Sequence, residues 1–337
     1  MRTTVKQWTV SDVCREESSH RVFRHVCKGL GVILPNCFLL FLILCSAASA
    51  QTGGDASRPR IDLPAETAGF DRIVSTLISA FDAVDIVALD DTHQRKVDSD
   101  LRIRLVRAPE FAKKVRVIVV EFANTADQPI LDRYTNGDNV PVAELRQVWR
   151  NTCCPDTWDS PVYADFLAAV RDVNHGLPMD KRIRVLAADP PAGTPATERD
   201  ASAISVLKKQ GLDKAGKALL IFGGGHLSYA NGAVTRAMQD WRPGRTFVVF
   251  IRGGNDPGYM PFEQALRSQV RPILFSVTKS PFRNFSTSFL GGGSKAFVNG
   301  VWVDVAPNPW ALPGQEADAW VYFGNSPDVD TFVRPIR

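Results

Sequence analysis

The stretch Val115-Arg-Val-Ile-Val-Val-Glu121 is a short run of β-branched residues that ends in a carboxylate. Three more apolar runs end in polar groups, at residues 90–93, 189–191 and 223–226. Runs this short and this rich in Val, Ile and Leu are typical of buried strands in a parallel sheet. Ligands bind beyond the carboxyl ends of such strands. We therefore expect the polar side chains at the four ends to converge on one site, namely His93, Glu121, Asp189 and His226.

The segments between these strands show helical periodicity. Residues 70–81 and 94–106 each predict an amphipathic helix, and residues 126–176 predict a helical insertion that is interrupted by a loop at 153–159. Further strands are predicted at 247–251 and 319–323, and a hairpin at 297–305 turns at Asn299-Gly300. Alternating strands and helices predict an α/β fold. We expect a central, largely parallel or mixed sheet with helices on both faces and an active cleft at the C-terminal strand ends.

The first fifty residues have the features of a signal peptide. Three basic residues precede the apolar run Cys37-Phe-Leu-Leu-Phe-Leu-Ile-Leu-Cys45, and Ala48-Ser-Ala50 is a cleavage signal. We predict export to the periplasm or the medium after cleavage near Ala50, with no membrane span afterwards. An uncleaved anchor is the alternative, although the apolar run is short for a span. Residues 51–67 are then a flexible lead-in, and 68–337 form a single α/β domain.

Composition excludes several functional classes. The chain has 337 residues, of which 23% are charged and 45% hydrophobic, as is ordinary for a globular protein. Most of the net charge of +4 belongs to residues 1–50, so no nucleic-acid surface is expected. Outside that segment the cysteines are Cys153 and Cys154, which lack metal-ligand spacing. We interpret them as structural or incidental, with a vicinal or intermolecular disulfide as the alternative. His175 is expected to be structural, at the end of a helix.

Taken together, the Asp-x-His, Glu and Gly-x-x-His elements resemble a known superfamily. It contains erythromycin esterase-like hydrolases, ChaN-like haem-uptake proteins and Tiki/TraB-like proteins, and the likeness is to a bacterial exported branch over residues 68–324. The resemblance also rests on the segments Val119–Asn124, Leu131–Tyr134, Val140–Leu145, Val148–Arg150, Trp158–Pro161, Arg184–Leu186 and Asp189–Pro191. It implies a central sheet with a cleft at the strand ends. In the hydrolase branch, the first histidine acts on water, and the glutamates and second histidine orient it or bind a metal.

Carried over by motif, these roles fall on His93, Glu121 and His226, with Asp91 at the usual glutamate position. The usual first motif is Gly-Glu-x-His-Gly, whereas this chain has Asp90-Asp-Thr-His-Gln94. Asp91 is one methylene shorter than Glu. Asp90 and Gln94 replace glycines that permit a left-handed backbone, which Gln adopts less readily than Asp. These departures affect the expected catalytic competence more than the expected fold.

The residues themselves indicate general-base chemistry. His93 can accept a proton from water near neutral pH, with Asp91 or Glu121 fixing its tautomer; alternatively it caps the next helix. Glu121 needs a partner if buried, which Arg133 or a bound metal could supply. Asn124 is a further candidate beside these groups, for substrate contact or support of the site.

The other two strand ends have both functional and structural interpretations. Asp189 contacts substrate or supports the site, or it simply forms a turn before two prolines. Gly223-Gly-Gly-His226 presents amide donors to an anion, or makes a tight strand-to-helix turn. His93, Glu121 and His226 together could ligate a divalent metal such as Zn, Mn or Fe, or run a metal-free hydrolysis. The chain has no Gly-x-Ser-x-Gly elbow, which disfavours a serine hydrolase.

We therefore expect a hydrolase of an ester, amide or lactone bond in a small molecule, working with or without a metal. The alternatives are a haem or iron-cofactor binding protein of the ChaN-like type and a non-catalytic relative. Residues 254–296 carry no functional prediction.

Overall fold

A computed structural model describes residues 58–64, 66–153, 155–266, 269–279, 295–298, 301–304 and 313–333. These residues lie in one compact unit, Thr52–Arg337. The predicted signal peptide, Cys154 and the predicted Asn299-Gly300 turn lie outside the described residues. None of the described helices is long and apolar enough to cross a membrane.

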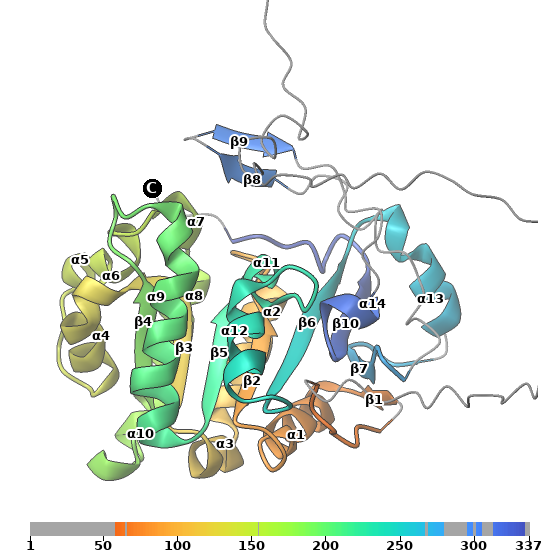
Figure 1. Ribbon diagram of the computed structural model, residues 1–337, viewed down its shortest axis with the longest axis horizontal. Helices are drawn as coiled ribbons and strands as arrows, with labels where there is room; N and C mark the ends of the chain where they lie inside the picture. The colour runs from red at the N-terminus through yellow and green to blue at the C-terminus, as the bar shows by residue number, and fades with distance from the viewer. Residues whose placement is uncertain are drawn as a thin grey trace, which may run out of the picture. The chain divides into compact units, whose positions relative to one another are not determined.

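In the described part of the chain, eight strands form one mixed sheet in the order β1-β7-β10-β6-β2-β5-β3-β4 (Figure 1). Their bounds are β1 Glu66–Ala68, β2 Ile86–Asp90, β3 Val117–Asn124, β4 Arg184–Asp189, β5 Ala218–Phe222, β6 Thr246–Gly254, β7 Ile273–Ser276 and β10 Ala319–Asn325. The six strands from β10 to β4 are parallel, whereas β7 and β1 add an antiparallel edge. A separate two-stranded sheet pairs β8 (Lys295–Val298) with β9 (Val301–Asp304). The predicted α/β fold is confirmed.

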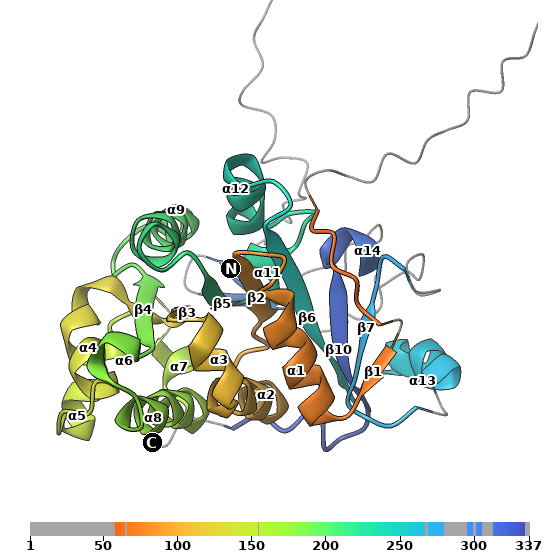
Figure 2. The ribbon, with the colours of Figure 1, turned by 90° about the horizontal axis from the view of Figure 1, so that it is seen from below.

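Helices cover both faces of the sheet (Figure 2). One face carries α1 (Phe70–Ala80), α2 (Lys96–Arg107), α3 (Pro109–Lys114) and α8 (Pro161–His175); the other carries α9 (Arg199–Val206) and α12 (Ala233–Trp241). Strand side chains alternate between the faces. In β3, Ile118 and Val120 join the first core, and Val117 and Val119 join the second. This two-sided burial explains why the strands have continuous apolar sequences.

Short helices connect these elements. Between β3 and β4 the chain forms a 3-10 turn at Thr125–Asp127, α4 (Gln128–Thr135), α5 (Val142–Leu145), α6 (Gln147–Arg150), α7 (Pro155–Trp158) and α8. After β4 come α9, a π-helical turn at Leu207–Leu212 and α10 (Asp213–Ala215). Helix α11 (Gly224–Leu227) follows β5, α13 (Met260–Leu266) follows β6, and α14 (Pro313–Glu316) precedes β10. His175 is the exposed last residue of α8, as expected.

The structure corrects three local predictions. Glu66 and Thr67, predicted as the end of the flexible lead-in, belong to β1, because they pair antiparallel with the unpredicted strand β7. The helix predicted from Gln94 begins at Lys96, since Gln94 has a left-handed backbone with φ of 62°. The segment predicted as a loop at 153–159 contains the one-turn helix α7, whose Trp158 is buried.

Candidate functional site

Asp91, directly after β2, is a fully buried carboxylate held by two donors. Its Oδ1 accepts from Arg102 of α2 at 3.0 Å and its Oδ2 accepts from the Tyr163 hydroxyl of α8 at 3.2 Å. Burial works to raise the pKa of Asp91, but the charge of Arg102 and the contact with His93 outweigh it. The pKa therefore lies well below its usual range, and Asp91 is an acceptor at neutral pH.

His93 lies between Asp91 and the glycine turn after β5. Its Nδ1 faces Asp91 Oδ2 at 3.5 Å, which is longer than an ordinary hydrogen bond, and it has no hydrogen-bond partner among the described residues. Its ring packs edge-to-face on Trp158, with centroids 4.5 Å apart. The side chain remains 38% exposed, so water can reach it. Burial opposes protonation, but the contact with Asp91 and its charge outweigh this and raise the pKa of His93.

Gly223 brings His93 and Glu121 to the same place. A Cβ on Gly223 would lie 3.1 Å from His93 Cε1 and 3.4 Å from Glu121 Oε2. Glu121 Oε2 accepts from the Gly223 amide at 2.7 Å, and Oε1 accepts from Arg199 at 2.8 Å. His226 Nε2 lies 3.2 Å from the same Oε1. Burial works to raise the pKa of Glu121, but its contact with His226 and the surrounding cations lower it to about 2.

His226 is held on both ring nitrogens. Its Nδ1 lies 2.5 Å from Asp200 Oδ1, while Nε2 faces Glu121. Burial opposes the charge, but the two carboxylates outweigh it and raise the pKa of His226 to about 10. His226 is therefore an imidazolium at neutral pH, so it supplies positive charge and does not accept a proton as a base would.

Asp189, at the end of β4, completes this network. Its Oδ1 accepts from Arg199 Nε at 2.7 Å, so one guanidinium joins Asp189 to Glu121. Its Oδ2 is buried and finds no hydrogen-bond partner among the described residues. Burial raises the pKa of Asp189 to about 6 against the charge of Arg199. The four predicted strand ends thus meet at one edge of the sheet.

Gln94 is fixed in its left-handed conformation by contacts on three sides. Its amide Nε2 donates to the carbonyls of Asp156 and Thr157 at 2.8 and 2.9 Å. Its backbone N–H donates to the Tyr163 hydroxyl at 3.1 Å. The strain of a positive φ in a non-glycine residue is thereby offset by hydrogen bonds.

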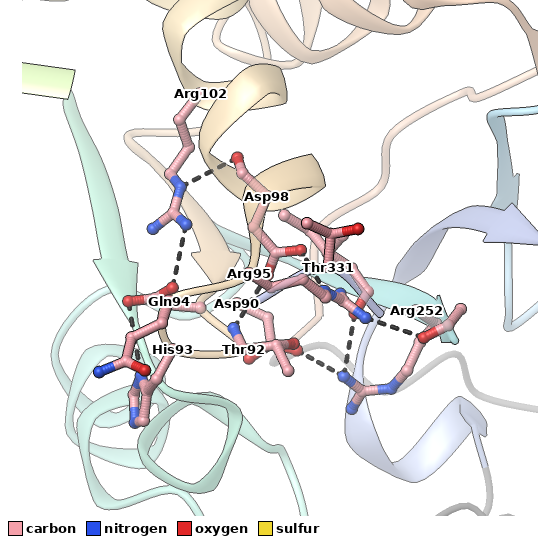
Figure 3. Close-up of polar contacts among 12 residues, drawn as sticks. Asp90, Thr92, His93, Gln94, Arg95, Asp98, Arg102, Arg252 and Thr331 are labelled. Atoms are coloured by element: carbon pink, nitrogen blue, oxygen red, sulfur yellow. Dashed lines mark hydrogen bonds and ion pairs between the residues drawn. The ribbon is translucent and has the colours of Figure 1, made fainter. Parts of the chain in front are cut away.

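A cavity of 370 Å³ adjoins this loop. Asp90, Asp91, Thr92 and the glycine turn line one side, and Phe250, Arg252 and Glu316 line another. Arg252 lies 2.5 Å from Asp90 Oδ2 and 3.8 Å from Glu316 (Figure 3). A larger cavity of 870 Å³ lies over α1, α2 and α3 and shares no residue with the site. We take the smaller cavity as the relevant one because it contacts the β2–α2 loop.

Two predicted site residues have other roles. Arg133 contacts Glu144 at 2.7 Å, so the expectation that it pairs with Glu121 is wrong, and Arg199 takes that place. The Asn124 side chain accepts from the amides of residues 126 and 127 and donates to two carbonyls of α6, which caps the turn after β3.

Several functional partners carry no motif in the sequence. They are Arg102, Tyr163, Arg199 and Asp200, which reach the site from α2, α8 and α9. Trp158 of α7 lies in a segment that carries the resemblance, but no role was predicted for it. The one signal was the helical periodicity of these segments, which says nothing about a polar contact.

The residues proposed as metal ligands do not fit a metal in this arrangement. Both ring nitrogens of His226 face carboxylates, and a guanidinium lies 2.8 Å from Glu121, where a dication would be repelled. No group of three or more His, Cys, Asp or Glu among the described residues is arranged to hold an ion. The predicted ligands His93, Glu121 and His226 are therefore not arranged as a metal site among the described residues.

Comparison with known proteins bears on the fold. No protein-family model and no curated protein matches the chain. A crystal structure of a Bacillus cereus protein gives a TM-score of 0.51 at 10% identity, covering 84% of this chain and 95% of that one. A variant of erythromycin esterase EreC in its open conformation gives 0.45 at 11% identity, covering 77% and 95%. Cofacially haem-bound ChaN of Campylobacter jejuni gives 0.36 at 15% identity, covering 55% and 86%. The Bacillus cereus likeness shows the fold alone.

Proposed function

We propose that this chain is a hydrolase in which His93 activates water to attack an ester, amide or lactone bond of a small molecule. One observation carries the proposal. His93 combines an accessible ring with a buried Nδ1 that faces the ionised carboxylate of Asp91. A hydrogen on Nδ1 leaves Nε2 as the proton acceptor, which is the arrangement a general base needs.

The proposed hydrolysis consumes one water molecule and needs no cofactor. His93 Nε2 takes a proton from water while the water oxygen bonds to the carbonyl carbon. Asp91 stabilises the imidazolium that forms. His93 then returns the proton to the leaving oxygen or nitrogen as the bond to it breaks. The cations His226 and Arg199, held beside His93 through Glu121, supply positive charge near the carbonyl oxygen as it becomes an oxyanion.

The adjoining cavity supports a small substrate. At 370 Å³ it is within the range of ordinary ligand pockets, and Asp91 and Thr92 belong to both the cavity and the histidine loop. Its lining mixes carboxylates and Arg252 with Phe250, so we propose a polar substrate with one apolar portion.

The test is a panel of chromogenic esters, amides and lactones with the chain from residue 51 onward, its His93→Gln variant and a His175→Gln control. His175 is exposed at the end of α8, away from the loop. We expect turnover that falls about a hundredfold or more in His93→Gln and is unchanged in His175→Gln. Turnover that survives His93→Gln would refute the assignment of the base. No turnover together with a haem absorbance band on titration would favour the haem-binding alternative. The absence of both turnover and a haem band would favour the non-catalytic alternative.

We further propose that the protein acts after export. The basic and apolar pattern of residues 21–50 supports this. N-terminal sequencing of the expressed full chain is the test. A mature end near Gln51 in the exported fraction is expected, and a chain that keeps Met1 and stays inside the cell would contradict the proposal.

A further inference from the structure

Tyr163 links the histidine loop to the helical segment between β3 and β4. Its hydroxyl is buried at the start of α8, 69 residues from Gln94 and 72 from Asp91. It accepts from the Gln94 N–H at 3.1 Å and contacts Asp91 Oδ2 at 3.2 Å. The same Oδ2 faces His93 Nδ1. Four groups therefore form a continuous chain from a backbone amide to the imidazole.

The direction of this chain is fixed at both ends. A backbone N–H can only donate, so the hydroxyl must accept from Gln94 and send its single hydrogen to Asp91. Burial is the largest cause of the raised pKa of Tyr163, so the phenol keeps its hydrogen at any ordinary pH. Ionised Asp91 can only accept, on one oxygen from Arg102 and on the other from Tyr163, while His93 Nδ1 faces this second oxygen at 3.5 Å. The hydrogen between Asp91 and His93 must then come from Nδ1.

We propose that Tyr163 is a positioning residue that orders the Asp91–His93 pair and so presents His93 Nε2 as the basic nitrogen. The inference rests on the proposed function, since it concerns the same base. Two contacts make the arrangement rigid. Tyr163 anchors the left-handed Gln94 that follows His93. Trp158, which lies five residues before Tyr163, packs on the His93 imidazole with ring centroids 4.5 Å apart. The α7–α8 corner therefore sets the position of the catalytic loop.

The test compares Tyr163→Phe with a matched control, Ser99→Ala. The Ser99 hydroxyl donates to the Val162 carbonyl at 3.0 Å, so its loss also breaks a buried hydrogen bond to α8 beside Tyr163, without touching the loop. The first measurement is NMR of isotopically labelled imidazole nitrogens, on the alkaline side of the His93 titration. The His93→Gln variant assigns the signal. The second is steady-state kinetics on any substrate found in the panel above.

We expect the Nδ1–H tautomer in the parent and in Ser99→Ala, and a mixture of tautomers in Tyr163→Phe. For kinetics we expect kcat to fall about tenfold or more with KM little changed, because the general-base contribution is of order a hundredfold to ten-thousandfold. An unchanged tautomer in Tyr163→Phe would overturn the inference, as would an equal loss of kcat in Ser99→Ala. The NMR measurement needs no substrate, so the inference can hold even if the proposed hydrolysis fails.

Discussion

Replacing Arg102 by Met should destabilise the protein strongly, because it leaves the Asp91 charge without its main partner. The side chain of Arg102 is 2% exposed and that of Asp91 is 0% exposed, so water cannot replace the guanidinium. Arg102 also donates to the Asp98 carbonyl at 3.0 Å. Removing one partner of a buried pair costs about 3–5 kcal/mol. In a domain of this size that corresponds to a fall of roughly 6–20 °C in Tm.

Denaturant unfolding of a double-mutant cycle measures this cost. Asp91→Asn/Arg102→Met removes both charges, so it should recover at least about 1–2 kcal/mol relative to the sum of the single variants. Lys96→Met is the control, since its pair with Asp100 is about half exposed and should contribute at most about 1 kcal/mol.

The pH dependence of the same cycle provides a second check. Asp91 has a depressed pKa in the folded state, so its contribution to stability is present above the ordinary carboxyl pKa and is lost as pH falls. The gap between parent and Arg102→Met should therefore narrow below about pH 4. If Arg102→Met costs no more than Lys96→Met at neutral pH, the buried pair does not hold Asp91 as described.

Three more predictions concern neighbouring residues. Gln94→Gly should be about 1 kcal/mol more stable than Gln94→Ala in denaturant unfolding, because both lose the amide contacts but only Ala keeps the strain at φ of 62°; equal stabilities would contradict the left-handed backbone. Gly223→Ala should lower turnover by displacing the His93 ring, which a Cβ would approach to 3.1 Å, whereas Gly176→Ala at the end of α8 would make only an ordinary contact at 3.5 Å with the Val173 carbonyl and should leave turnover unchanged. His226 has a folded pKa raised to about 10, so its stabilising charge is complete below its ordinary value and is lost as pH rises through that range. His226→Gln should thus flatten the alkaline fall in the unfolding free energy, and an unaltered pH profile would show that the charge is not stabilising.

The sequence predicted the parallel part of the sheet well because burial on both faces leaves a strong local signal. The runs at 115–120 and 218–222 fall on β3 and β5, and their polar ends meet as expected. The antiparallel edge was missed because β1 and β7 have only three and four residues. Strands that short give too few alternations for a periodic pattern.

Site partners were harder to predict than site positions. His93, Glu121, Asp189 and His226 could be found from strand ends, since topology alone brings those together. The groups that set their charge states come from helix faces. Arg199 was missed in favour of Arg133, because choosing between two arginines on two helices requires the packing of α9 and α4 against the sheet.

Gln94, which departs from the glycine of the resembled motif, has a structural role in this loop. A glycine there would relieve the positive φ, but it could not donate to the carbonyls of Asp156 and Thr157. The loop therefore carries strain that α7 and Tyr163 hold in place, next to a histidine nitrogen that lacks an ordinary hydrogen bond. Strain and an incompletely satisfied buried group in the same turn each cost stability, and such costs cluster where function requires them. Under the proposed function, this strained β2–α2 loop supports a working general base over a lapsed one.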